Sequence, residues 1–398
     1  MPQTINTNIN SLTAQRNLNS SQASLATSIQ RLSSGLRVNS AKDDAAGLAI
    51  AERMNTQIRG LNVASRNAND GISLAQVAEG ALGKVGDSLQ RIRELAVQSS
   101  NATNSATDRA ALQAEVAQLS DEVNRVAKQT SFNGTKLLDG SFTAATFQIG
   151  ANSGEAITIA ALTNVSTDGL SNVTYGSADI PDISSGAVTT LTAVASGTLA
   201  ISVGGFEYPL SGLGVARSAE ERLGQVAEAI NRRTSDTGVT AYLSKEADGD
   251  YALAFRSSTL DSTGVAAAVT FGGFTVAETG IGDTSATVAS TTVAGFGTLS
   301  VASTEDAWLA IKQVDDALDQ VNNARATLGA VQSRFETAVS NIATQSENTS
   351  AARGRIVDAD FASETANLSR AQILQQAGTA MVAQANQLPQ QVLQLLKG

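Results

Sequence analysis

The chain is 398 residues long, carries a formal net charge of −10 and contains neither histidine nor cysteine. The missing residue types exclude histidine general bases, thiol nucleophiles, disulfides and thiolate metal sites, so we predict no catalytic, cofactor-binding or metal-binding site. The acidic balance argues against nucleic acid or an anionic membrane surface as a partner. No apolar run is long enough for a membrane span. Only 4% of residues are aromatic, which suits slender helix-on-helix packing better than a large globular core.

The residues up to about Leu36 predict a helix with a thin apolar stripe. The stripe recurs at intervals of three and four residues and consists of Ile5, Ile9, Leu12, Leu25, Ile29, Leu32 and Leu36. This spacing is typical of a helix whose narrow seam faces another helix. Ser33-Ser34-Gly35 then marks a break in the helix. The N-terminus shows no basic patch followed by an apolar core, so we expect no Sec signal peptide.

Two more helices and a hairpin region are predicted before residue 150. A helical pattern runs from Ala45 to about Gln98, and its length favours a rod over a compact globule. Ser105-Ala106-Thr107-Asp108 resembles a capping box and starts a third helix that can fold back along the second. Turn dipeptides within residues 132–140 and partial alternation over 142–149 predict a small β-hairpin region.

Residues 177–300 have a different composition, rich in Gly, Ser, Thr, Val and Ala. With 6 Lys/Arg against 13 Asp/Glu, this segment holds most of the acidity. Strand pairs around Gly204-Gly205 and Asp248-Gly249 flank a helix capped at Ser218, which predicts a β-hairpin, helix, β-hairpin module. We interpret its acidic face as a solvated outer surface rather than a ligand site.

Helix returns over residues 304–354 and continues to the C-terminus. The cleanest heptad repeat is formed by Val314, Val321, Leu328, Phe335 and Ile342. A second thin stripe consists of Leu374, Gly378, Met381, Ala385, Leu388, Val392 and Leu395. Pro389 has no N–H, so we expect a bend or break near Leu388. Pairing is the simplest way to bury both terminal stripes. The pattern therefore predicts a mainly α fold with paired terminal helices forming a coiled coil, an α-helical rod with a β-hairpin, and an outer α+β domain.

Several long motifs resemble those of bacterial flagellin, in the same order. They are Ile5-Asn6-Thr7-Asn8 and residues 31–37, 41–50, 66–73, 90–98, 373–378 and 384–390. The similarity covers roughly the first 150 and the last 95 residues. The middle module is similar to the insert motif of flagellins and hook-associated proteins.

The resemblance implies a subunit that polymerises into the helical flagellar filament for motility. It implies an inner coiled-coil domain of residues 1–44 and 355–398, a helical rod domain of 45–176 and 301–354, and an outer variable domain of 177–300. The two terminal stripes are then the filament-assembly seam, disordered until copies pack together. Implied partners are further copies of the chain, an export chaperone, and cap and hook-associated proteins. The implied location is the extracellular flagellum, reached by type III export.

Host recognition is also implied. In many flagellins the flagellin-sensing Toll-like receptor contacts a Gln-Arg-x-Arg-Glu-Leu-Ala stretch, and the matching positions here are Arg91 and Leu95, with Glu115 on the next helix. In the alternative interpretation, Arg91 and Glu115 are solvated or paired, and Leu95 belongs to an inter-subunit contact. The two interpretations are compatible.

Two other functions were weighed. A hook–filament junction protein has similar ends, but the Ala-Asn-Gln-Leu-Pro-Gln ending and the Arg91 region favour flagellin. An enzyme in the insert would need a carboxylate pair such as Asp248 and Asp250, but two acids around an Asp-Gly turn are typical of a hairpin turn. We therefore expect no enzymatic activity. The Ser/Thr-rich segment is interpreted as flexible polar surface rather than as a site of O-linked glycans.

Overall fold

The computed structural model describes residues 7–184, 187–245, 251–281, 285–286 and 289–397. The chain divides into two compact units. One unit comprises residues 1–73, 146–158 and 332–398, and the other comprises residues 74–145 and 159–331. Long helices come from both ends of the chain and small antiparallel sheets from its middle, which confirms the predicted fold class.

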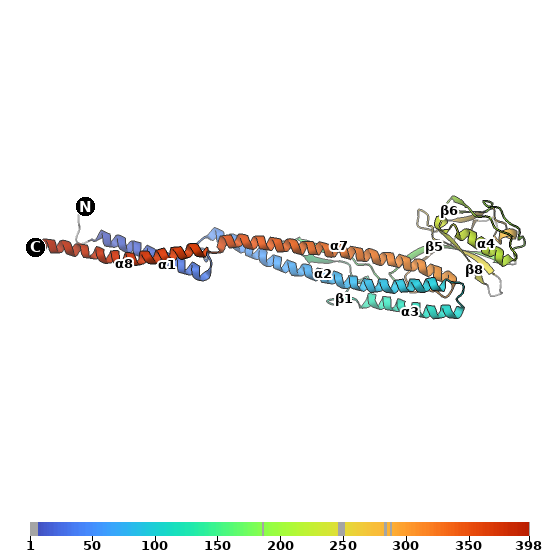
Figure 1. Ribbon diagram of the computed structural model, residues 1–398, viewed down its shortest axis with the longest axis horizontal. Coiled ribbons are helices and arrows are strands. Elements are labelled where there is room, and N and C mark those ends of the chain that lie inside the picture. The colour runs from blue at the N-terminus through green and yellow to red at the C-terminus, as the bar shows by residue number, and fades with distance from the viewer. Residues whose placement is uncertain (1–6, 185–186, 246–250, 282–284, 287–288, 398) are drawn as a thin grey trace. The chain divides into compact units, whose positions relative to one another are not determined.

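The terminal helices α1 (Ile9–Ser34) and α8 (Phe361–Lys397) lie side by side (Figure 1). The Asn8 side chain accepts a hydrogen bond from the Ser11 N–H at the start of α1, and Gly35 ends the helix at a φ of 71°. The pairing of the two ends is thus confirmed. The break expected at Pro389 is wrong, because α8 is helical on both sides of that residue. A helix accommodates proline by losing one internal hydrogen bond, and here that loss does not end the helix.

The end of α1 is tied to the end of α7 (Thr304–Val357) by main-chain hydrogen bonds. The Arg37 N–H donates to the Val357 carbonyl at 2.7 Å, and the Ala359 N–H donates to the Gly35 carbonyl at 2.9 Å. The Arg37 guanidinium also donates to the Ile356 carbonyl at 2.6 Å. A cation at this position satisfies carbonyls that have no partner at a helix C-terminus and complements the helix dipole.

The helices α2 (Ala45–Ser99) and α7 supply large apolar side chains to the interior of both units. The predicted heptad is buried, with exposed fractions of 0–6% for Val314, Val321, Leu328, Phe335 and Ile342. In the first unit, Gly71 of α2 faces the Phe335 ring so closely that a Cβ would lie 2.7 Å from its Cζ. This glycine therefore provides the space that the phenylalanine ring occupies.

Helix α3 (Ala106–Gln129) starts with the predicted capping box, in which Ser105 and Asp108 each accept a backbone N–H from the other. Two short hairpins follow. They are formed by β1 (Ser131–Phe132) with β2 (Thr135–Lys136) and by β3 (Ala145–Gln148) with β4 (Ala156–Ile159). Phe147 of the second hairpin meets Phe335 edge to face, with ring centroids 5.5 Å apart. The predicted hairpin region is thus present and is packed on the helices.

The middle of the chain forms two four-stranded antiparallel sheets. The first has the order β12-β5-β9-β8, from β5 (Asn172–Ser184), β8 (Val239–Lys245), β9 (Tyr251–Ser257) and β12 (Ala289–Ala294). The second has the order β11-β10-β6-β7, from β6 (Ala200–Val203), β7 (Phe206–Pro209), β10 (Val269–Gly272) and β11 (Ser285–Ala286). The remaining helices are α4 (Ala219–Asn231), α5 (Thr234–Thr237) and α6 (Val276–Thr279). The predicted β-hairpin, helix, β-hairpin module corresponds to β6-β7-α4-β8-β9.

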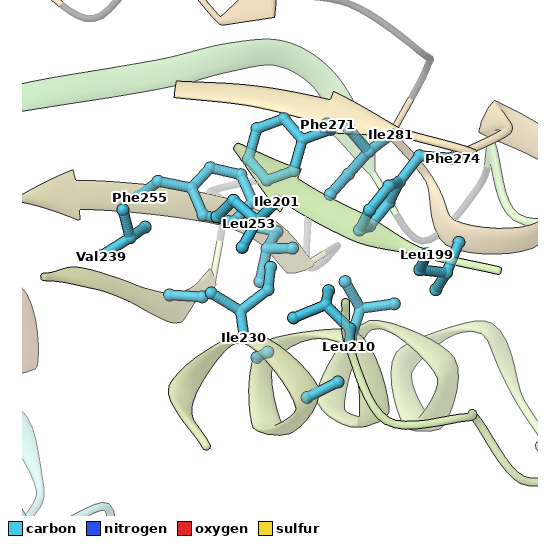
Figure 2. Close-up of a cluster of buried hydrophobic side chains, with 14 of the residues drawn as sticks. Leu199, Ile201, Leu210, Ile230, Val239, Leu253, Phe255, Phe271, Phe274 and Ile281 are labelled. Carbon is cyan, nitrogen blue, oxygen red and sulfur yellow. The ribbon is translucent and has the colours of Figure 1, made fainter. Parts of the chain in front are cut away.

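This middle region has its own apolar core. Figure 2 shows Ile230 of α4 below the strands, with Phe255 and Phe271 above it. The Phe271 ring lies 4.9 Å from that of Phe255 and 5.3 Å from that of Phe274. The Asn231 side chain joins α4 to β8, because it donates to the Ala241 carbonyl and accepts from the Ala241 N–H, both at 2.8 Å. The insert thus has a closed core of its own.

Substituting Gly71 tests the packing of Phe335. Gly71→Ala should lower the free energy of unfolding by about 1–3 kcal/mol, because the added methyl overpacks a buried ring. Gly80→Ala is the matched control in the same helix: a Cβ there meets nothing within 4 Å. That change should stabilise by about 0.5–1 kcal/mol through backbone entropy. Denaturant unfolding followed by circular dichroism measures both, and equal shifts for the two variants would contradict the packing.

Alkaline pH should destabilise the fold around Tyr242. This residue is 5% exposed, and its ring meets that of Trp308 edge to face, with ring centroids 5.9 Å apart. Burial, and secondly the Glu305 carboxylate, raise the pKa of the Tyr242 hydroxyl above its ordinary value. The unfolded tyrosine ionises near pH 10, so this stabilisation is present below about pH 10 and is lost as the pH rises further. Tyr242→Phe should therefore flatten the fall in unfolding free energy above about pH 10, measured by Trp308 fluorescence. An unchanged slope in the variant would contradict the assignment.

Candidate interaction surface

The contact between α1 and α8 combines small side chains with leucine and valine. On α1 the buried and half-buried positions recur every seven residues in two rows, Ser11, Leu18, Leu25 and Leu32, and Ala14, Ser21 and Ser28. On α8 the corresponding rows are Glu364, Ala371, Gly378 and Ala385, and Leu368, Gln375 and Val382. A Cβ on Gly378 would lie 3.2 Å from the Leu18 Cδ1, so the helices approach closely at this point. Small residues at heptad positions allow such an approach but bury little apolar area.

Polar groups fix the register of the pair. Asn8 Nδ2 donates to the Ala385 carbonyl at 2.7 Å, and Ser11 Oγ donates to Asn386 Oδ1 at 2.8 Å. Farther along, Arg31 Nη1 lies 3.9 Å from Glu364 Oε2, and the Glu364 residue is 8% exposed. Directional bonds of this kind specify alignment more than they add stability.

Only some of the large apolar residues of the two helices, among them Leu18, Leu25 and Leu368, take part in this contact. Those exposed to solvent are Ile9, Leu12 and Ile29 on α1, and Phe361, Ile373, Leu374 and Met381 on α8. Leu374 and Met381 line a groove of about 530 Å³ beside the helix contact, whose α1 wall includes Asn10, Thr13 and Asn17. Exposed apolar surface on this scale is typical of an interaction site.

The predicted assembly residues therefore divide between two faces. Ala385 is buried and Leu25, Leu32 and Leu36 are half-buried, whereas Ile9, Leu12, Ile29, Leu374 and Met381 are exposed. Ile5 and the side chains of Leu388, Val392 and Leu395 lie outside the described residues. The expectation that the two stripes bury each other is only partly correct. Leu25, Leu32, Gly378 and Ala385 of the stripes lie in the contact, but the rows also contain Ser and Ala residues that the stripes did not include. A seven-residue repeat of small residues is the signal that would have found them.

The candidate receptor residues lie on α2 and α3. Arg91 Nη2 is 2.9 Å from Glu115 Oε1 across the two helices, and Arg91 Nη1 is 2.9 Å from Glu94 Oε2. Hydrogen bonds with Glu94, then Glu115, raise the pKa of Arg91, so its charge is retained. Leu95 is 1% exposed. A direct contact of the Leu95 side chain with any partner is thus incompatible with this packing, and Arg91 and Glu115 present the polar surface.

No group of three or more Asp or Glu residues able to hold a metal ion occurs among the described residues. Asp248 and Asp250, the acids weighed as a carboxylate pair, lie outside those residues. Over the part of the chain that the structure describes, no helix combines the length and apolar character needed to cross a membrane.

Comparison with known proteins identifies both helical ends. Residues 5–143 match the bacterial flagellin N-terminal helical region, and residues 311–396 match the bacterial flagellin C-terminal helical region. Residues 198–259, which contain the module built on α4, match the flagellin hook IN motif. The two terminal matches together include most of α1, α2, α3, α7 and α8.

Full-length relatives are also flagellins. The chain is 38% identical to B-type flagellin of Pseudomonas aeruginosa over 100% of both chains, and 42% identical to flagellin B of Vibrio cholerae over 98% of this chain and 99% of the relative. Among solved structures, FliC from Burkholderia pseudomallei is 26% identical, with a TM-score of 0.39, over 66% of this chain and 99% of that one. The flagellar junction protein of Legionella pneumophila is 14% identical, with a TM-score of 0.42, over 77% and 99%. Sequence identity therefore decides the assignment: the chain belongs to the bacterial flagellin family and is a subunit of the flagellar filament.

Proposed function

We propose that the chain polymerises through the outward apolar face of the α1–α8 pair, and that this face binds further copies of the same chain. The observation that carries this proposal is the set of large apolar side chains left exposed on the two helices, with Ile9 64%, Met381 62% and Ile373 66% exposed. Contacts between unlike faces of identical subunits generate open helical filaments when the rotation between neighbours does not close a ring.

The same face explains why the termini need neighbours. Fully burying one leucine or methionine contributes about 1.5–3 kcal/mol, whereas a small-residue contact contributes much less. Ordering the backbone costs about 1–2 kcal/mol per residue. The isolated helix pair therefore has little stability of its own, and burial of the exposed side chains between copies offsets the cost of ordering.

The remaining roles follow from the family. We infer that residues 1–44 and 355–398 form the inner domain, 45–176 and 301–354 the rod domain, and 177–300 the outer domain of the filament. The proposal also includes export of the unfolded chain through the flagellar type III apparatus, with an export chaperone, and assembly with cap and hook-associated proteins as partners. It places the chain outside the cell, in the flagellum.

Leu374 and Met381 test the assembly face. Leu374→Gln and Met381→Gln should each raise the critical concentration for polymerisation about tenfold or more, because each removes apolar burial worth more than about 1.4 kcal/mol. Val215→Gln is the matched control: Val215 is 70% exposed and lies in the insert. Sedimentation of polymer at graded protein concentrations measures the effect. Filaments forming at the wild-type concentration in both α8 variants would exclude this face.

We further propose that the pair formed by Arg91 and Glu115 is the polar surface that the flagellin-sensing Toll-like receptor recognises. Both side chains are close to half exposed, at 47% and 44%, so a receptor group can replace one partner of the pair. Leu95 lies one helical turn from Arg91 and is buried, so it contributes by packing that positions α2 and not by contact with the receptor. An exposed ion pair contributes little to folding, so these residues can change without loss of the fold.

Alanine substitution separates recognition from folding. Arg91→Ala and Glu115→Ala should each reduce receptor activation by monomeric protein about tenfold, because a charge-assisted contact contributes about 1.5–3 kcal/mol. Arg125→Ala is the matched control, since Arg125 and Glu122 form a similarly exposed pair on α3. A reporter-cell dose response measures activation. Equal responses for all three variants would contradict the assignment.

A further inference from the structure

A cavity of about 560 Å³ lies within the second unit, between the β12-β5-β9-β8 sheet and the first turns of α7. The sheet contributes Tyr175 and Arg256, and α7 contributes Trp308 and Lys312. Hydroxyl groups, including those of Ser235 and Thr240, complete the lining. The volume falls within the usual range for small-molecule sites, about 300–1,000 Å³.

The charge of this cavity is opposite to that of the chain. The net charge is −10, yet the lining contains one arginine, one lysine and no Asp or Glu. The Arg256 guanidinium lies 4.6 Å from the centroid of the Tyr175 ring and donates to the Glu305 carboxylate through Nη2. Its Nε and Nη1 are buried without a hydrogen-bond partner in the described structure. Because these two atoms are closed to solvent, a ligand meets Arg256 through the 18% of its side chain that stays accessible. A planar guanidinium favours a carboxylate or another planar anion.

The aromatic rings and hydroxyl groups of the lining further restrict the chemical class of ligand that the cavity can bind. The partly exposed Trp308 and Tyr175 rings offer apolar surfaces, and hydroxyls can both donate and accept hydrogen bonds. A pyranose with one carboxylate has the matching parts: an apolar C–H face, several hydroxyls and one planar anion. Inorganic phosphate has no apolar face. We infer that this cavity binds a sugar acid, whose carboxylate meets Arg256 and Lys312 and whose ring packs on Trp308.

The chain contains its own reporter, because Trp308 is the single tryptophan. Titrating the monomeric full-length protein with D-glucuronate should change Trp308 emission saturably, with matching heat in calorimetry. D-glucose, acetate and inorganic phosphate should each bind at least about tenfold more weakly. Because the measurement uses monomer, its outcome does not depend on filament assembly or on receptor recognition.

Two variants connect binding to the cations. Arg256→Lys keeps the charge but removes the fork of donors, and Lys312→Gln removes an exposed charge. Each should raise the Kd for glucuronate about tenfold. Lys128→Gln, at an exposed lysine on α3, is the control and should leave the Kd unchanged. Absence of saturable glucuronate binding, equal binding of phosphate or glucose, or wild-type affinity in both cavity variants would overturn the inference.

Discussion

The close contact between α1 and α8 is the constraint on which the functional surface depends. Because Gly378 and Ala385 stand where a coiled coil usually places leucine, the two helices come together over small side chains. Hydrogen bonds at Asn8 and Ser11 then set their alignment. Large residues such as Leu374 and Met381 have no place in that contact and remain on the outside. The pair is thus aligned while large apolar side chains remain exposed, and these form the surface that we propose for contact with other copies.

The same seven-residue repeat has a different result on α7. There the repeat consists of Val, Leu, Phe and Ile, and all five of its large residues are buried within their own units. Apolar burial scales with side-chain size, so these helices stabilise one another within a single chain. Under the proposed assembly, the size of the side chains at the repeat positions, rather than the repeat itself, separates the part of the chain that is stable alone from the part that needs other copies.

The helices, the capping box at Ser105 and the module around α4 could all be predicted from the sequence, because each is encoded by local spacing and caps. The facing rows of α1 and α8 could be predicted only in part: the stripes included Leu25, Leu32 and Ala385 but missed Ser11 and Ala371, since small and polar residues carry little hydrophobic signal. The burial of Arg222 in α4 could not be predicted for the same reason. This residue is 0% exposed, and its guanidinium donates to the Thr192 carbonyl. The position of Arg256 beside Tyr175 could not be predicted from residue spacing either, because the two residues are far apart in the sequence and meet only in the folded chain.

In the proposed recognition surface, the positions of Arg91 and Glu115 are linked to the packing of the core. Arg91 is held by carboxylates from both α2 and α3, and Leu95, four residues later on the same face of α2, is fully buried. Substituting the two surface residues changes the surface charge without disturbing the core. A shift of their backbone would disturb the packing of the buried Leu95. The position of the pair is therefore set by the core, while its chemistry is not. Substitutions that abolish recognition by shifting the position of this pair would therefore also destabilise the fold.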